Sequence, residues 1–158
     1  MTSLRFLMLL SLVAWIGGII FFAFVLAPTV FKVLPSRELA GSVVNRALPV
    51  LHWIGIASGT IFLVSSLTYE YLTRGTAHPF ALRHILVALM IVLTLISQVA
   101  IGGKMMALRH DMGVIDNVPQ DDPRRVEFNR LHHWSTRAEG TVLILGLAVI
   151  WLTARRLS

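Results

Sequence analysis

The sequence contains no cysteine. This absence excludes disulfide bonds, thiolate metal ligands and cysteine nucleophiles, and it leaves the redox compartment undetermined. Any metal ion would therefore have to be held by other side chains.

Charged residues are also scarce. They make up 14% of the chain, against about 25% in a soluble domain. No charged residue occurs in three long stretches, which lie between Arg5 and Lys32, between Arg46 and Glu70, and between Arg83 and Lys104. Each stretch accommodates a membrane-spanning helix of about 20 residues. We therefore expect an integral membrane protein rather than a soluble one.

Acidic residues are few, and the formal net charge is +6. In a membrane protein this excess is expected from basic residues that flank the spans and meet anionic lipid. We therefore predict the lipid bilayer as a partner and no binding of nucleic acid.

The apolar run from Phe6 to Phe31 far exceeds the 7–15 residues that are usual in a signal peptide, and no small-x-small cleavage site follows it. We read it as a retained first helix. The sequence then predicts one all-α transmembrane domain over 1–158, a polytopic four-helix bundle with spans near 4–33, 49–72, 80–110 and 123–155.

Between the first two spans, the stretch Pro35–Leu48 places Leu39, Val43 and Ala47 four residues apart, after Ser36 as a plausible N-cap. This spacing predicts a short amphipathic helix at the membrane interface. Pro49 suits the first turn of the second span.

Four spans place both termini on one side of the membrane and the two longer connections on the other, here called the two-loop end. Eight basic residues lie at the two-loop end: Lys32, Arg37, Arg46, Lys104, Arg109, Arg124, Arg125 and Arg130. Five lie at the terminal end: Arg5, Arg74, Arg83, Arg155 and Arg156. The difference favours cytoplasmic loops 1–2 and 3–4 in a bacterial inner membrane.

The fourth span is too short to cross the membrane on its apolar residues alone. Only fifteen uncharged residues separate Glu139 from Arg155, about 22 Å of helix against a hydrocarbon core of about 30 Å. The span must therefore include Glu139 and residues before it. Ionisable groups at membrane depth usually mark a functional site.

Histidines gather at the same end of the predicted bundle: His52, His110, His132 and His133. His132, Ser135 and Glu139 share one face of the fourth helix, within an arc of about 60°. This polar stripe suits metal ligation, a proton relay or structural pairing of the carboxylate. A lone histidine at a helix end is more often interfacial, which is our reading of His110 or His133 taken singly.

No catalytic residue is predicted. Ser135 lies between His132 and Glu139, whereas a catalytic triad needs the base between the nucleophile and the carboxylate.

Several motifs resemble the transmembrane protein 205-like family: Ala14-Trp15 with the Phe21–Phe24 stretch, Val33–Arg37, Leu48-Pro49 and Phe128–Ser135. The most specific part is Phe-x-x-x-His-x-x-Ser, which is Phe128, His132 and Ser135 here. The family has bacterial members and a human member associated with cisplatin resistance. The resemblance implies a four-helix membrane protein with no settled activity. The family carries an asparagine where this chain has Glu139.

Three functions follow as hypotheses. The first is binding of a transition-metal ion or metal-containing cofactor through His52, His132 and Glu139, with Ser135 behind them and His110 as a further candidate ligand, for metal or small-solute handling. The second is a redox protein that holds haem b between His52 and His132 or His133. The third is a non-catalytic subunit of a larger membrane complex, or a homo-oligomer, in which the stripe only fixes helix packing. Because small residues predict close helix packing, we expect colourless protein.

Overall fold

The computed structural model describes residues 1–157, with all side chains of that range except those of Asp116, Arg156 and Leu157. Ser158, the last residue of the predicted domain, lies outside the described residues. The elements in chain order are α1 (Thr2–Phe21), the π-helical η1 (Phe22–Leu26), α2 (Ala27–Val33), α3 (Arg37–Arg74), α4 (Leu82–Ile96), the π-helical η2 (Ser97–Gly102), α5 (Gly103–Met112), the 3₁₀ turn η3 (Ile115–Asn117) and α6 (Pro123–Leu157).

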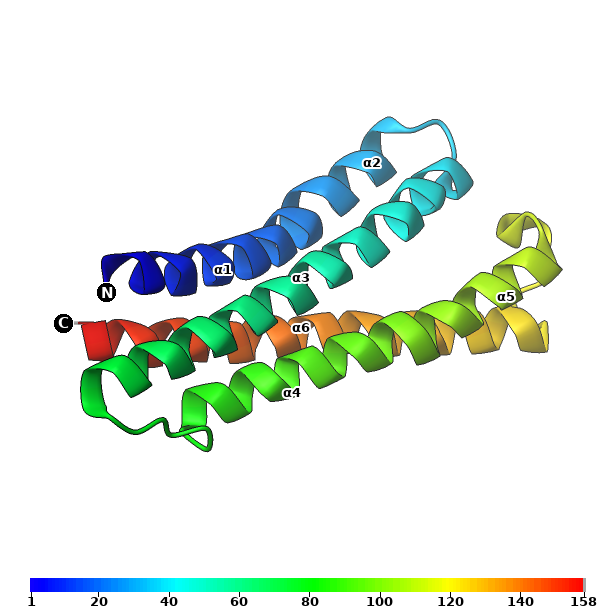
Figure 1. The fold of residues 1–158 in the computed structure, drawn as a ribbon. Helices are drawn as coiled ribbons and strands as arrows, with labels where there is room; N and C mark the ends of the chain where they lie inside the picture. The colour runs from blue at the N-terminus through cyan, green and yellow to red at the C-terminus, as the bar shows by residue number, and fades with distance from the viewer. Residues whose placement is uncertain (158) are drawn as a thin grey trace.

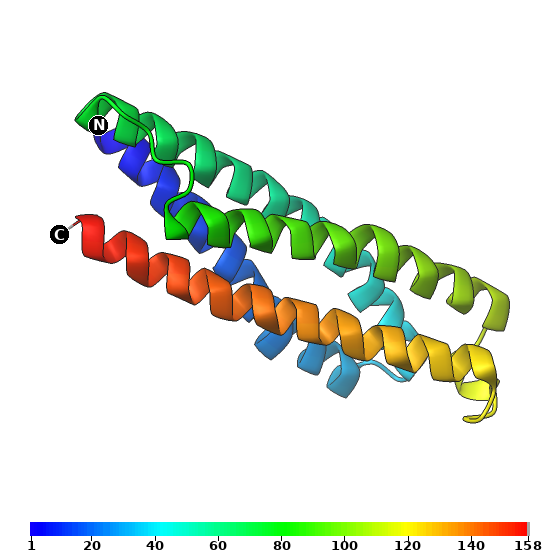
Figure 2. The same cartoon turned by 90° about the horizontal axis from the view of Figure 1, so that it is seen from below.

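These elements form four antiparallel rods, because α1, η1 and α2 are continuous, as are α4, η2 and α5 (Figure 1). Both termini lie at one end of the bundle (Figure 2). Four helices are long and apolar enough to span a membrane: Thr2–Val33, Arg37–Arg74, Leu82–Met112 and Pro123–Arg155. The prediction of an all-α, four-helix integral membrane protein is confirmed.

The prediction of a separate interfacial helix before Pro49 is wrong. Its residues form about the first three turns of α3, which continues through Pro49 to Arg74. Ser36 does cap this helix, since its Oγ accepts a hydrogen bond from the Leu39 N–H at 3.2 Å. Proline removes one backbone hydrogen bond without ending a helix that its neighbours support. Arg109 of α5 also donates to the Glu38 carbonyl in the first turn of α3, at 3.1 Å.

The apolar core lies in the half of the bundle that holds the termini. Trp15 of α1 is buried in a groove of α3, where a Cβ on Gly55 or Gly59 would overlap its indole. A Cβ on Gly146 of α6 would likewise overlap Ile16. The close helix packing that the small residues predicted is therefore present between α1 and α3.

The other half of the bundle is more open. There α2 packs on α3, and η2 and α5 pack on α6, and the two pairs diverge in Figure 1. The two rods that are built from several helices each contain one π-helical segment, η1 and η2. Pro28 explains the first, because it cannot donate to the Phe24 carbonyl and its ring crowds that oxygen. Gly102 and Gly103 end the second segment.

Candidate functional site

One buried hydrogen-bonded group joins three of the four rods. His52 of α3 contacts Gln98 of η2 through Nδ1, which lies 2.7 Å from Oε1, and Glu139 of α6 through Nε2, which lies 2.6 Å from Oε1. The His52 side chain is 4% exposed and that of Glu139 is 18% exposed. We call these residues the polar trio. Glu139 therefore faces the interior of the bundle and has a polar partner there.

The partners of His52 determine how its charge is balanced. With the Gln98 amide oxygen facing Nδ1, that nitrogen donates, and Nε2 either donates to the Glu139 carboxylate from a positive ring or accepts from the protonated carboxyl of Glu139. Turning the Gln98 amide would offer Nδ1 an N–H donor instead and leave a neutral ring that donates only to Glu139.

The polar trio lies at membrane depth. Glu139 is 16 residues from Arg155, and Gln98 is 15 residues from Arg83, which correspond to about 24 Å and 22 Å along their helices. A hydrocarbon core of about 30 Å that starts at these arginines includes the trio, in the third nearest the two-loop end.

A cavity of about 720 Å³ opens beside the trio, between all four rods in the two-loop half. The rod of α1, η1 and α2 contributes an apolar wall: Ile19, Phe22, Ala23, Ala27 and Phe31. The other rods contribute the polar trio, Ser97, His132, Ser135 and Thr136, and two cations, Arg46 and Arg109. We call this space the two-loop cavity. Its volume is typical of sites for small organic molecules.

The structure brings four predicted site residues together, because His52, His132, Ser135 and Glu139 all line the two-loop cavity. It does not bring His110 there, whose side chain is 91% exposed beside Asp111. The ring of His133 lies 6.3 Å from that of His132, between centroids, but does not line the cavity.

Within the described residues, no group of three or more His, Asp or Glu side chains has the arrangement of a metal site. The cavity contains histidines and one carboxylate, yet both nitrogens of His52 already have partners. The ring of His132 has no hydrogen bond to the described residues and is exposed to the cavity.

Sequence reasoning missed Gln98 and the cavity's cations. Gln98 is an uncharged residue within a charge-free stretch, so charge counting passed over it. Its signal is polarity, since Ser97 and Gln98 are adjacent polar residues in a mostly apolar run. Ser97 is also informative in the structure, because its buried Oγ has no hydrogen-bond partner among the described residues.

The chain was compared with family models, curated proteins and solved structures. The model of a domain of unknown function, DUF4149, matches residues 10–113, a range that includes His52 and Gln98 and ends before α6. No curated protein and no solved structure matched significantly. Because the matched range covers well over half of the chain, the protein belongs to the family described as "Domain of unknown function (DUF4149)".

Proposed function

We propose that this integral membrane protein binds a small amphipathic solute in the two-loop cavity and that its role is small-solute handling. The carrying observation is the cavity itself, about 720 Å³ between the four rods with one apolar wall and one polar wall. Binding sites commonly combine a mostly apolar lining with a few placed polar groups. The unpartnered hydroxyl of Ser97 supports the proposal, because a bound polar group would satisfy it.

The charges around the cavity favour an anionic headgroup. Its one carboxylate, Glu139, is paired with His52, whereas Arg46 and Arg109 line the cavity with no carboxylate of the described residues within ion-pair distance. Unbalanced arginines attract carboxylate or phosphate groups. A solute with an apolar body and an acidic head therefore fits both walls.

The test uses full-length protein in an uncharged detergent and a fluorescent fatty acid, 11-(dansylamino)undecanoic acid, as the probe. We expect saturable fluorescence enhancement. Ala27→Trp places a large side chain into the cavity from its apolar wall and should abolish this enhancement. Ala88→Trp makes the same change at an exposed position of α4 that does not line the cavity, and it should leave binding intact. Equal loss in both variants, or no saturable binding by the native chain, would refute the proposal.

The charge argument has its own variant. Arg109→Gln removes one cation and should weaken the acidic probe about tenfold, the effect of a lost charge-assisted hydrogen bond. The uncharged amide of the same probe should bind native and Arg109→Gln protein equally. If the acid and the amide bind native protein equally well, the solute is not an anion.

Haem b is the second candidate, favoured by one observation. The ring of His132 lines a cavity of this size without a hydrogen bond, so it could serve as an axial ligand. His52 would first have to release Gln98 or Glu139. A Soret band in purified protein that is lost in His132→Ala would establish this reading over the fatty-acid-like solute.

A resident transition-metal ion is the weaker form of the metal hypothesis. A closed zinc site takes four protein ligands and a catalytic one takes three, and the described residues offer no such group. Metal analysis of the purified protein decides this point. The resemblance to the transmembrane protein 205-like family and the role as a subunit of a larger complex remain proposals.

A further inference from the structure

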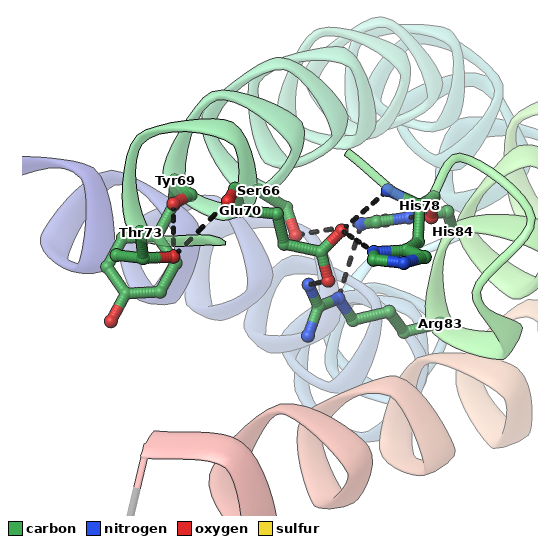
Figure 3. A network of polar contacts seen from close by, with 7 residues as sticks. All are labelled: Ser66, Tyr69, Glu70, Thr73, His78, Arg83 and His84. Atoms are coloured by element: carbon green, nitrogen blue, oxygen red, sulfur yellow. Dashed lines mark hydrogen bonds and ion pairs between the residues drawn. The ribbon is translucent and has the colours of Figure 1, made fainter. Parts of the chain in front are cut away.

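A second buried polar cluster lies at the terminal end, where α3 meets α4 (Figure 3). Glu70 is 2% exposed and accepts a hydrogen bond from Arg83 at 2.6 Å. Its other oxygen accepts from the backbone N–H of His78 at 3.0 Å. His84 contacts the hydroxyl of Ser66 at 2.8 Å and the His78 carbonyl at 2.9 Å. These contacts hold the 75–81 connection against α3 and fix the position of Arg83.

A cavity of about 180 Å³ adjoins this cluster. Side chains from all four rods meet around it: Tyr69, Glu70, Thr73, Arg74, Arg83 and Thr153, with Met8. We call it the terminal cavity. In Figure 3, Tyr69 and Thr73 lie on one side of Glu70, and His78 and His84 lie on the other.

The terminal cavity contains hydrogen-bond donors that the protein does not use. Thr153 is 2% exposed, and its Oγ has no partner among the described residues. The Tyr69 hydroxyl accepts hydrogen bonds from Nε and an Nη of Arg5, at 3.0 and 2.5 Å, so its own proton remains available to donate. A buried hydroxyl without a partner indicates a bound water or ligand.

The local charge is positive. Glu70 balances Arg83, with which it forms an ion pair. Arg74 lines the cavity, and no carboxylate of the described residues lies within ion-pair distance of it. Arg5 adds a further cation behind Tyr69. A cation would be repelled here, whereas an anion with several acceptor oxygens would satisfy the arginines and the hydroxyls together.

We propose that the terminal cavity is a binding site for a phosphate group, either free phosphate or the headgroup of an anionic lipid. Arg74 supplies the unbalanced charge, Arg83 adds guanidinium N–H donors, and Thr153 and Tyr69 donate from their hydroxyls. Arg74 and Thr153, which line the cavity, lie at the terminal ends of the apolar spans, where the headgroup level of a bilayer is expected. This site is independent of the two-loop cavity and of the solute proposed there.

The experiment uses full-length protein in dodecyl maltoside, which carries no phosphate. Thermal stability is measured against sodium phosphate, against sodium chloride at equal ionic strength, and against dihexanoyl phosphatidic acid. We expect a saturable stabilisation by phosphate or phosphatidic acid that chloride does not reproduce. Stabilisation by both identifies a site open to free phosphate, and stabilisation by the lipid alone identifies a headgroup site.

Two variants and one control test the residues. Arg74→Gln should weaken the phosphate ligand about tenfold, the effect of a charge-assisted hydrogen bond. Thr153→Val should weaken it about fivefold, while unliganded protein stays as stable as the native chain because an unpartnered hydroxyl has been removed. Arg155→Gln makes the same charge change at the same end, where Arg155 lies over Trp151 outside the cavity, and should change affinity less than twofold.

The proposal is overturned if neither ligand stabilises the protein beyond chloride, because the cavity would then hold only water. It is also overturned if Arg155→Gln weakens the ligand as much as Arg74→Gln does, since general surface charge would then explain binding.

Discussion

At the scale of single residues, the Glu139 side chain lies at membrane depth and is hydrogen-bonded to the imidazole of His52. An unmatched carboxylate there would be expensive. His52 provides the match at 2.6 Å, and Gln98 holds the far side of the same ring. Both ring nitrogens of His52 therefore have a hydrogen-bond partner. The energetic role of Glu139 can be separated from its charge by substitution.

Glu139→Gln should keep the fold, because the amide oxygen can still accept from His52 Nε2. We expect a loss of about 1 kcal/mol in unfolding free energy, against about 3 kcal/mol for Glu139→Leu, which leaves His52 without that partner. Unfolding titrations with sodium dodecyl sulfate measure both values. Glu127→Gln is the control, since Glu127 forms only a surface pair with Arg130 and should change stability by less than about 1 kcal/mol. A Leu variant as stable as the Gln variant would contradict this account.

At the scale of elements, α1 and α3 approach through glycines rather than through interdigitated large side chains. Trp15 fills the space that Cβ atoms at Gly55 and Gly59 would occupy. Gly17, two residues after Trp15, has nothing within 4 Å of a built Cβ. The two glycine positions therefore have opposite tolerance for a methyl group.

We expect Gly55→Ala to lower the unfolding free energy by about 1–3 kcal/mol, because the methyl group forces α1 and α3 apart. Gly17→Ala is the matched control and should be neutral or slightly stabilising, because alanine favours helix more than glycine does. Resistance to proteolysis in detergent gives the ranking. Equal loss in the two variants would show that the effect is one of helix propensity rather than packing.

The start of α6 lies outside the membrane, and we expect the stability of its first turn to depend on pH. Asp122 accepts from the backbone N–H of Arg124 at 2.8 Å and from its guanidinium. These hydrogen bonds lower the pKa of Asp122 from 3.8 to about 2. A lowered folded pKa means that the contribution to stability is complete above pH 3.8 and is lost as the pH falls through about 2.

Asp122→Ala should therefore speed amide exchange in the first turn of α6 at pH 5, where the native cap is intact. The native chain should keep this protection at pH 3 and lose it near pH 2, as followed by exchange mass spectrometry corrected for intrinsic rates. Asp121→Ala provides the control, because Asp121 makes no capping hydrogen bond. Protection that persists unchanged in Asp122→Ala would remove this role.

At the scale of the whole molecule, orientation rests on basic residues at the two ends. Arg83 is buried against Glu70. It therefore contributes less than a free arginine to the positive charge of the terminal end. The side chain of Arg156 lies outside the described residues. The absence of cysteine makes orientation directly measurable, since one introduced thiol is the only reactive site.

We expect Thr76→Cys, in the 75–81 connection, to react with a membrane-impermeant maleimide on intact cells. Gln120→Cys, before α6, should react only after permeabilisation, because cytoplasmic loops carry the larger basic count. The native chain, which has no thiol, is the blank. The reverse labelling pattern would invert the proposed orientation.

Charge-free stretches predicted three of the four spanning helices, because a spanning segment needs little beyond length and apolarity, and the fourth was predicted from the shorter apolar run after Glu139. The same counting identified Glu139 as an ionisable group at membrane depth, yet it hid Gln98, which carries no charge. It also missed the pairing of Glu70 with Arg83, because each borders a charge-free stretch and reads as a flanking residue. Their contact depends on the turn at Gly75, where φ is 73°. The positions of charged residues along the sequence do not predict the geometry of such a turn. The interfacial helix was mispredicted because Pro49 was taken as a start rather than as an interior residue.

The apolar core between the two polar clusters makes the protein an electrical insulator. His52 and Ser66 are 14 residues apart on α3, about 21 Å, and Trp15, Phe62 and Met90 fill the interval. A membrane potential would fall mainly across this layer. An anion that enters either cavity from its own side therefore does little electrical work. A charge passed from one cavity to the other would cross almost the whole potential, at about 2.3 kcal/mol per 100 mV.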